Sequence, residues 1–410
     1  MDLRPIGKEE RKLGQWDFFF LWAGAAISIM EIFSGAMLAP LGLLAGVAVI
    51  IAGHVIGNSL LALSCLHGQE MGITSMLSVR FSFGVRGSHF FALLNIIQLV
   101  GWMAVMQIVA ADAMNAVTSF SSRSFWIVVI GIITTLWAMG GQKVWKVLNS
   151  VSTVLLVLLT VVMTYQVFVS FPPVNVPQDP MPLGLAMDIV IAMPISWLPL
   201  ASDYSRYAKR GSMRGTWAGY FVFSSWMYFI GLISALGTGE SFPTRTLMLM
   251  GLGVPAMIIV ALSTITSDYM DVYSAAASWL NVREKSDSRV TMLVFGAAGI
   301  ALSLVFPIEQ YQNFLLFIGS LFCPLFAIVI VDYLTKGRDY DVEAALGKDG
   351  YWYTHGFSMK AMAAWALGLT VFWVSSHYAI GGSLPSMAAS ALLYMALDHL
   401  STFPVSRNQR

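Results

Sequence analysis

Long apolar runs recur along the whole chain, and the charged residues sit mostly in the short stretches between them. The hydrocarbon core of a bilayer is about 30 Å thick and needs roughly 20 apolar residues in a helix. Runs of that kind lie at approximately 16–38, 41–65, 89–117, 124–140, 146–170, 183–201, 215–236, 251–280, 290–307, 311–333, 359–378 and 382–402. A membrane barrel would show shorter segments of alternating polarity. The pattern therefore predicts an all-α membrane protein with twelve transmembrane helices.

Composition narrows the class of protein. Hydrophobic residues make up 57% of the 410 residues and charged residues only 11%, against about 25% charged in an ordinary soluble protein. A soluble enzyme is therefore excluded. The net charge of +1 leaves no polycationic surface for nucleic acid. The two cysteines, Cys65 and Cys323, lie in apolar runs, where we expect packing rather than a disulfide framework.

The positive charges are sorted along the predicted topology. With the N-terminus inside, 21 of the 23 Lys and Arg fall in inner segments, and only Arg123 and Arg245 fall in outer ones. Such an excess is typical of cytoplasmic loops. The mixed-charge start of the chain lacks the apolar core of a signal peptide. We expect a multi-pass protein of the bacterial inner membrane that keeps its first residue and has both ends in the cytoplasm.

Acidic residues, unlike basic ones, remain inside the predicted spans. Glu31 lies in the first, Asp188 in the sixth, and Asp268 and Asp271 in the eighth, while Asp112 is near the outer end of the third. A carboxylate in a membrane is costly unless it faces a cavity, a partner or a cation, and it marks a functional pathway by default. The alternative is a protonated acid that hydrogen-bonds another helix.

Two spans carry signs of an interruption. In the first, small residues such as Gly24, Ser28 and Gly35 surround Glu31, which also fits ordinary close helix packing. The sixth contains Pro194 and Pro199, and two prolines remove two helical hydrogen bonds. Freed carbonyls are tolerated only beside a cavity or buried in protein, where they can bind a cation or a substrate donor. Interruptions five helices apart are typical of inverted-repeat transporters.

Polar groups in the eighth and third spans suggest ligands. Thr266 and Ser267 could offer oxygen ligands to sodium together with carbonyls of a broken first helix, although such hydroxyls often bond their own helix. Asp268 and Asp271 share a helix face. In the third span Trp102 lies at the centre and Gln98 one turn away. This pair can stack on and read a flat heterocycle, but a central tryptophan is more often a packing residue.

Four motifs together resemble one family. They are RFSFGVRG at 80–87, GW at 101–102, SDYSRY at 202–207 and CPLFAIVIVDY at 323–333. Their order and spacing are similar to those of nucleobase-cation symport family 1, above all to its cytosine-permease and hydroxymethylpyrimidine-transporter branch. The likeness runs over nearly the whole chain.

The resemblance implies a fold and a site. The fold is a leucine-transporter-type core of five plus five helices in inverted repeat, with two extra C-terminal helices and alternating access to a midplane site. The resemblance implies that Trp102 stacks on the base and that Thr266 and Ser267 coordinate sodium with main-chain oxygens of the first helix, for which Ser28 is our candidate. Ser196 and Trp197 fall in the substrate region of the sixth helix. The resulting layout is an N-terminal segment 1–15, a transport core 16–335, a cytoplasmic loop 336–358, two helices in 359–402 and a tail 403–410.

Some positions depart from the cytosine-permease pattern. Leu99 replaces an amide, with Gln98 one residue earlier, and Asp268 stands where asparagine is usual. Glu31 has no carboxylate counterpart in that pattern. A carboxylate can accept from the amine of a 4-aminopyrimidine, whereas an ionised acid repels the carbonyls of uracil. These departures favour hydroxymethylpyrimidine over cytosine.

The sequence thus predicts a cation symporter that imports a pyrimidine-type base such as the thiamine precursor hydroxymethylpyrimidine. The alternative is a cytosine, other nucleobase or hydantoin permease, and a channel or intramembrane enzyme is more remote. HGQEMG at 67–72 lacks zinc-protease spacing, and no nucleophile elbow or nucleotide-binding motif occurs. We expect no catalysis, no cofactor, and a chain functional as a monomer in the bilayer. The coupling ion is sodium or a proton. The candidate substrate ligands are Trp102, Gln98, Glu31, Ser196, Trp197 and Asp271, and the candidate sodium ligands are Thr266, Ser267, the main chain of Ser28 and Asp268.

Overall fold

The computed structural model describes residues 3–118, 122–170, 181–239, 253–336, 340–347 and 350–402. The secondary structure of these residues is helical apart from turns and two isolated bridges. Arg245 and the tail 403–410, to which the sequence assigned sides of the membrane, lie outside the described residues.

The helices follow one another along the chain with short connections. They are α1 (Gln15–Ala26), α2 (Ile29–Ala36), α3 (Gly42–Met71), α4 (Ser75–Phe83), α5 (Val85–Val117), α6 (Arg123–Met139), α7 (Gly141–Ser170), α8 (Leu183–Ser196), α9 (Leu198–Ser205), α10 (Ser212–Thr238), α12 (Gly253–Val282), α13 (Ser288–Ser303), α14 (Tyr311–Lys336), α15 (Val342–Leu346), α16 (Met359–His377) and α17 (Ser383–Thr402).

Each of the twelve predicted runs contains a helix or a pair of helices. The first run divides into α1 and α2 and the sixth into α8 and α9, so both predicted interruptions are confirmed. In the described part of the chain, six helical stretches are each long and apolar enough to cross a membrane. The sequence did not predict α4, a short buried helix that follows α3 and precedes α5 in the chain.

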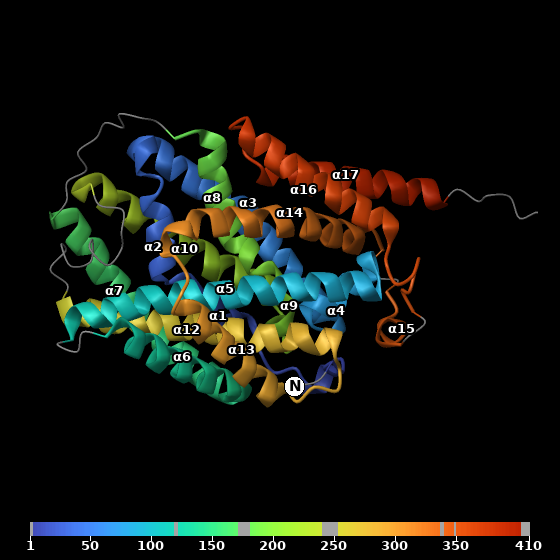
Figure 1. Ribbon diagram of the computed structural model, residues 1–410, viewed down its shortest axis with the longest axis horizontal. Coiled ribbons are helices and arrows are strands. Elements are labelled where there is room, and N and C mark those ends of the chain that lie inside the picture. The colour runs from blue at the N-terminus through green and yellow to red at the C-terminus, as the bar shows by residue number, and fades with distance from the viewer. Residues whose placement is uncertain are drawn as a thin grey trace, which may run out of the picture.

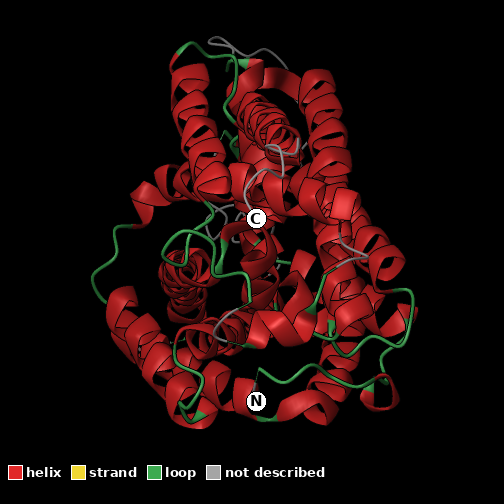
Figure 2. Ribbon diagram, turned by 90° about the vertical axis from the view of Figure 1, so that its right-hand side faces the viewer, coloured by secondary structure: helices red, strands yellow, loops and turns green. Residues whose placement is uncertain are grey.

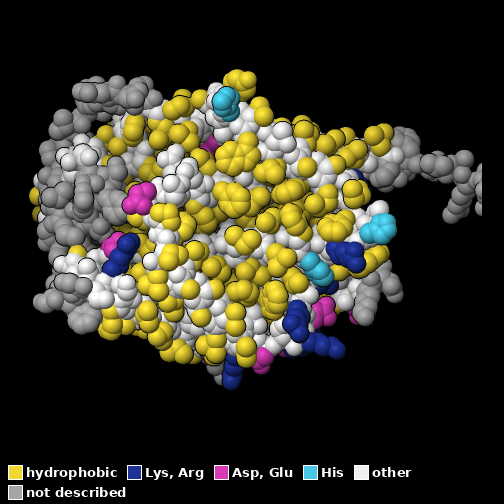
Figure 3. All heavy atoms as spheres, in the orientation of Figure 1, with side chains coloured by type: hydrophobic (Ala, Val, Ile, Leu, Met, Phe, Trp, Pro, Cys, Tyr) yellow, Lys and Arg dark blue, Asp and Glu magenta, His cyan; other side chains and the backbone are white. Residues whose placement is uncertain are grey.

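The long helices α5, α12 and α14 run alongside one another (Figure 1). α16 and α17 pack against each other and against α14 along one edge of the bundle, and the view turned by 90° shows helices surrounding the core on all sides (Figure 2). The face in Figure 3 is apolar across its middle, and most of its Lys and Arg side chains gather toward the end where α4 and α15 lie. This distribution is that of a bundle surrounded by lipid.

Two acids inside predicted spans have structural partners. Asp188 of α8 accepts hydrogen bonds from the backbone N–H groups of Gly382 at 2.6 Å and Ser383 at 2.8 Å. It therefore caps the start of α17, where unpaired N–H groups favour a carboxylate. Asp112 forms an ion pair with Arg123 at 2.8 Å. Neither acid lines the central cavity described below, so for Asp188 the structure favours the alternative of a hydrogen bond to another helix.

α2 and α10 touch backbone to backbone. A Cβ atom added to Gly35 of α2 would lie 2.1 Å from the carbonyl oxygen of Tyr228, and one added to Gly231 of α10 would lie 2.0 Å from that of Ile32. Real Cβ atoms do not approach other atoms so closely. Glycine at these two positions therefore lets the half-helix α2 lie directly against α10.

Replacing Gly231 with alanine is expected to push α2 away from α10. Overpacking of this kind costs about 1–3 kcal/mol, so the melting temperature of the purified protein in detergent falls. Gly319→Ala is the matched control, because a Cβ there meets Phe372 at an ordinary 3.4 Å. Equal melting temperatures for the two variants would contradict the close contact.

Candidate functional site

The break in the first span lies at Ile27 and Ser28. Ser28 is extended, with φ −129° and ψ 147°, and its hydroxyl accepts a hydrogen bond from the backbone N–H of Met30 at 3.2 Å. The serine thereby caps α2, as serine commonly does at helix starts. The break leaves the end of α1 and the start of α2 facing the same interior region, with Glu31 in the first turn of α2.

The break in the sixth span lies at Trp197, between Pro194 in α8 and Pro199 at the start of α9. The carbonyl of Ser196 accepts a hydrogen bond from the side-chain amide of Gln98 at 2.9 Å. A carbonyl freed by the interruption is thus satisfied by α5 rather than left in a low-dielectric interior.

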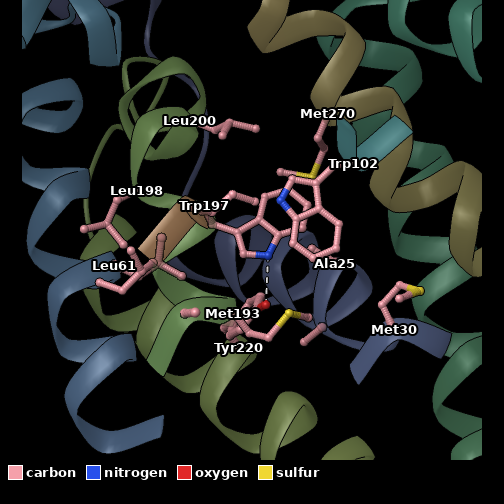
Figure 4. Packing of buried hydrophobic residues seen from close by; sticks show 14 of the residues in the cluster. Ala25, Met30, Leu61, Trp102, Met193, Trp197, Leu198, Leu200, Tyr220 and Met270 are labelled. Atoms are coloured by element: carbon pink, nitrogen blue, oxygen red, sulfur yellow. Dashed lines mark hydrogen bonds between the residues drawn. The ribbon is translucent and has the colours of Figure 1, made fainter. Parts of the chain in front are cut away.

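A small cavity lined by buried residues lies where the two breaks meet α5 and α12. The space between its atoms totals about 330 Å³, but the side chains fill it closely and leave room only for water-sized molecules. Trp102 and Trp197, both labelled in Figure 4, line this cavity together with Ala25, Met30 and Met193. The lining residues are Ala25, Ser28, Met30, Glu31, Trp102, Met106, Met193, Ser196, Trp197 and Asp271.

Glu31 connects the cavity to a chain of buried polar groups. The Tyr220 hydroxyl of α10 donates to its Oε1 at 2.6 Å, and Ser224 lies 2.9 Å from its Oε2. Tyr220 in turn accepts from Trp197 Nε1 at 2.8 Å, the contact drawn in Figure 4. Ser224 contacts His54 Nε2 at 2.5 Å. The wall indole Trp197 and the buried imidazole of His54 are therefore joined through one carboxyl group.

The candidate sodium site lies between α12 and the end of α1. Ser267 Oγ is 3.4 Å from the carbonyl oxygen of Ala25 and 3.1 Å from that of Ser263. Thr266 Oγ1 bonds the carbonyl of Ser263 at 2.8 Å. Ser267 thus contacts α1, whereas the Thr266 hydroxyl bonds its own helix.

Asp268 contacts α5. Its Oδ2 accepts from the Gln107 amide at 2.9 Å, and the Gln107 Oε1 accepts from Ser303 at 3.0 Å. Asp268 is fully buried and is not among the residues that line the cavity. Asp271, three residues later, does line it. Of the two acids that the sequence placed on one face, only Asp271 therefore lines the cavity.

The structure brings together most of the candidate residues. Glu31, Trp102, Ser196, Trp197 and Asp271 share one cavity with Ser28. Gln98 lies behind the wall, bonded to Ser196, and does not line the cavity.

The sequence reading missed several residues of the polar chain. Thr216, Tyr220, Ser224 and Tyr228 recur every four residues along α10 and mark a polar face that could have been recognised. His54 was harder to assign, because a single histidine in an apolar run does not reveal its partner. The methionines of the cavity wall carry no signal that separates them from core residues.

The chain is similar to several known proteins. The family model "permease for cytosine/purines, uracil, thiamine, allantoin" matches residues 5–395. The cytosine permease of Escherichia coli K12 is 25% identical over 368 residues, covering 86% of this chain and 82% of that protein. The hydantoin permease of Microbacterium maritypicum is 24% identical over 409 residues, covering 90% of this chain and 83% of that protein.

A solved structure has the same fold. A transporter of the nucleobase-cation-symport-1 family, in a closed conformation with bromovinylhydantoin bound, superposes with a TM-score of 0.86 at 21% identity. The match covers 99% of this chain and 97% of the other.

Tyr220→Phe is expected to destabilise the closed site more than Tyr228→Phe. The first change removes a hydroxyl with two buried partners, Trp197 and Glu31, whereas the second removes one bond to the carbonyl of Ile189. Each buried group left unpaired costs about 1–3 kcal/mol. Thermal unfolding of the two variants in the same detergent measures the difference, and equal losses would contradict the assigned role of Tyr220.

Proposed function

Because the chain belongs to the family of permeases for cytosine/purines, uracil, thiamine and allantoin, we propose that it imports a 4-aminopyrimidine such as hydroxymethylpyrimidine by cation-coupled alternating access. The protein is a multi-pass membrane transporter and not an enzyme. The proposal includes a bacterial inner membrane, cytoplasmic termini and function as a monomer.

The observation that carries the substrate class is that a carboxyl group and two indoles line the same cavity. Glu31, Trp102 and Trp197 all line the cavity and are almost entirely buried. Indoles can enclose a flat ring, and each oxygen of Glu31 can accept one more hydrogen bond beside those from α10. The amine of a 4-aminopyrimidine supplies such a donor. Asp271 and Ser196, on the same walls, are candidates for the other edge of the ring.

Cytosine remains the second candidate, since it carries the same amine and a cytosine permease is among the relatives. Gln98, which bonds the carbonyl of Ser196, is proposed to position the broken helix rather than to read the base.

For the coupling ion, sodium and a proton both have support. The contact of Ser267 with the carbonyl of Ala25 brings a hydroxyl and a main-chain oxygen together, which are ligands that a hard cation prefers. Thr266, the main chain of Ser28 and Asp268 complete the sodium candidates. The buried acids Glu31 and Asp271 favour a proton equally.

Glu31→Gln is expected to weaken 4-aminopyrimidine binding by at least about tenfold, because the loss of a charge-assisted hydrogen bond costs about 1.5–3 kcal/mol. The change in binding is measured by the thermal shift of the purified wild type and variant with hydroxymethylpyrimidine, cytosine, uracil, purines and hydantoins. Stabilisation of the wild type by purines alone would overturn the substrate class. Unchanged affinity in the variant, with uracil still rejected, would remove Glu31 from substrate selection.

Ser267→Ala is expected to abolish any stabilisation of the protein by sodium over potassium at equal ionic strength, since it removes the α12 hydroxyl that lies 3.4 Å from the Ala25 carbonyl. Ser320→Ala is the matched control, because Ser320 is equally buried and bonds only the carbonyl of Phe317 in its own helix. Sodium stabilisation that persists in Ser267→Ala would contradict a sodium site at this position.

A further inference from the structure

An open pocket lies where the starts of α1 and α10 meet the end of α3. It offers about 650 Å³ to water-sized molecules and shares no lining residue with the central cavity. The proposed transport therefore leaves this pocket unused. Both basic and apolar side chains line it, among them Trp16, Leu66, Gln69, Arg210, Met213 and Arg214.

Backbone contacts hold the walls of the pocket together. A Cβ atom added to Gly215 of α10 would lie 2.2 Å from the carbonyl oxygen of Gln15, so α10 and α1 touch directly beside the pocket. In the segments that lead into these helices, the N–H of Lys209 donates to the carbonyl of Leu13 at 2.7 Å, and the N–H of Leu13 donates to that of Tyr207 at 3.0 Å. The pocket is therefore part of the packed structure.

Gln69, at the end of α3, offers hydrogen-bond donors at the pocket. Its Oε1 accepts from the backbone N–H and from the hydroxyl of Ser212, both at 2.9 Å. A backbone N–H can only donate, so the bonded atom of the amide is its oxygen. Within the residues that the structure describes, the amide nitrogen of Gln69 has no protein partner. Its two N–H groups are therefore available to a ligand.

Two arginines bring positive charge to the same pocket. Arg210 and Arg214 are exposed, and in the described ranges of the chain neither forms an ion pair. Asp17, an acid in the lining, accepts from a backbone N–H of its own segment at 2.8 Å. Lys12 and Lys209 are exposed on the adjoining segments. Positive charge and N–H donors therefore predominate here, and they complement the oxygens of a phosphate group.

The pocket also lies where the apolar surface of the bundle ends. The indole of Trp16 is 67% exposed at the start of α1, and tryptophan gathers at membrane–water interfaces. Leu66 and Met213 contribute apolar lining. Farther along α3 and α10 from the pocket, Val55 and Val222 are exposed. The surface of these two helices thus changes from apolar to basic at the pocket.

We propose that this pocket binds the phosphate headgroup of an anionic phospholipid, whose acyl chains lie along the exposed apolar surface of α3 and α10. Arg210, Arg214 and the amide of Gln69 donate to the phosphate oxygens, and Trp16 packs beside the headgroup. The basic surroundings favour a lipid with net negative charge over a zwitterionic one, since each nearby Lys or Arg attracts the anionic lipid. Because the headgroup contacts α1, α3 and α10 at once, the bound lipid stabilises the fold.

The test uses the full-length protein, delipidated in detergent, and dioleoylphosphatidylglycerol as the probe. The rise in melting temperature is recorded against lipid concentration. Dioleoylphosphatidylcholine, which has the same chains and no net charge, and inorganic phosphate are titrated in parallel. The wild type is expected to reach half of its maximal rise at a phosphatidylglycerol concentration at least about tenfold lower than the phosphatidylcholine concentration. Inorganic phosphate is expected to give little of the rise, because it lacks the acyl chains.

Arg210→Gln combined with Arg214→Gln is expected to raise the half-saturating phosphatidylglycerol concentration at least about tenfold. Arg283→Gln combined with Arg289→Gln is the matched control. It removes the same charge from residues that are exposed where α13 follows α12 and that do not line the pocket, and it is expected to keep the wild-type value. Leu66→Trp fills the pocket without changing its charge and is expected to weaken phosphatidylglycerol binding as the arginine pair does.

Four outcomes would overturn the proposal. Equal half-saturation by the two lipids would remove the preference for an anionic headgroup. Equal losses in the two double variants would assign the attraction to the basic surface in general. A full rise with inorganic phosphate alone would indicate a site for free anions, and unchanged binding in both pocket variants would place the lipid elsewhere. None of these measurements involves a transported base, so they leave the proposed function untouched.

Discussion

The carboxyl group of Glu31 is the contact on which the centre of the structure depends. It is buried in the first turn of the half-helix α2 and bonds two side chains of α10. A buried carboxyl group without partners is too costly to keep in a membrane interior, so α2 is held in the one position where Tyr220 and Ser224 reach it. The glycine contacts between the same two helices bring their backbones close enough for these bonds to form. The cavity wall and the polar chain both follow from this attachment.

The second interrupted helix also has buried polar groups that need hydrogen-bond partners, and different residues supply them. A break frees backbone groups that water cannot satisfy in the interior, and at α8–α9 the Gln98 amide bonds a freed carbonyl. At α1–α2 the Ser28 hydroxyl caps the new helix start. At both breaks, side chains beside the cavity thus pair with the freed backbone groups. These polar groups therefore lie close to a ligand without being left unpaired.

Much of the fold could be predicted from the sequence, because helix length and charge sorting are imposed by the bilayer itself. Pro194 and Pro199 revealed one break directly, since proline removes helical hydrogen bonds. Glu31 and Trp102 were recognisable as site residues because a carboxylate and an indole are unusual at the middle of a span. Partner choice was not predictable. Asp188 and Glu31 are both acids in apolar runs, and only the tertiary contacts separate a helix cap from a cavity wall. Gln98 was likewise predicted as a ligand because it is a polar residue in an apolar run, although its amide donates a hydrogen bond to the Ser196 carbonyl of α8.

The cap that Asp188 provides makes the two last helices inseparable from the rest of the chain. The first ten predicted spans hold the cavity and both breaks, so α16 and α17 resemble an appendage that a shorter protein could omit. The carboxylate of Asp188 accepts hydrogen bonds from the first backbone N–H groups of α17. In a chain that stopped after α14, this carboxylate would lack these partners and would face lipid. A minimal ten-helix version, whether it arose by gene truncation or by engineering, therefore requires a compensating change at this one position in α8.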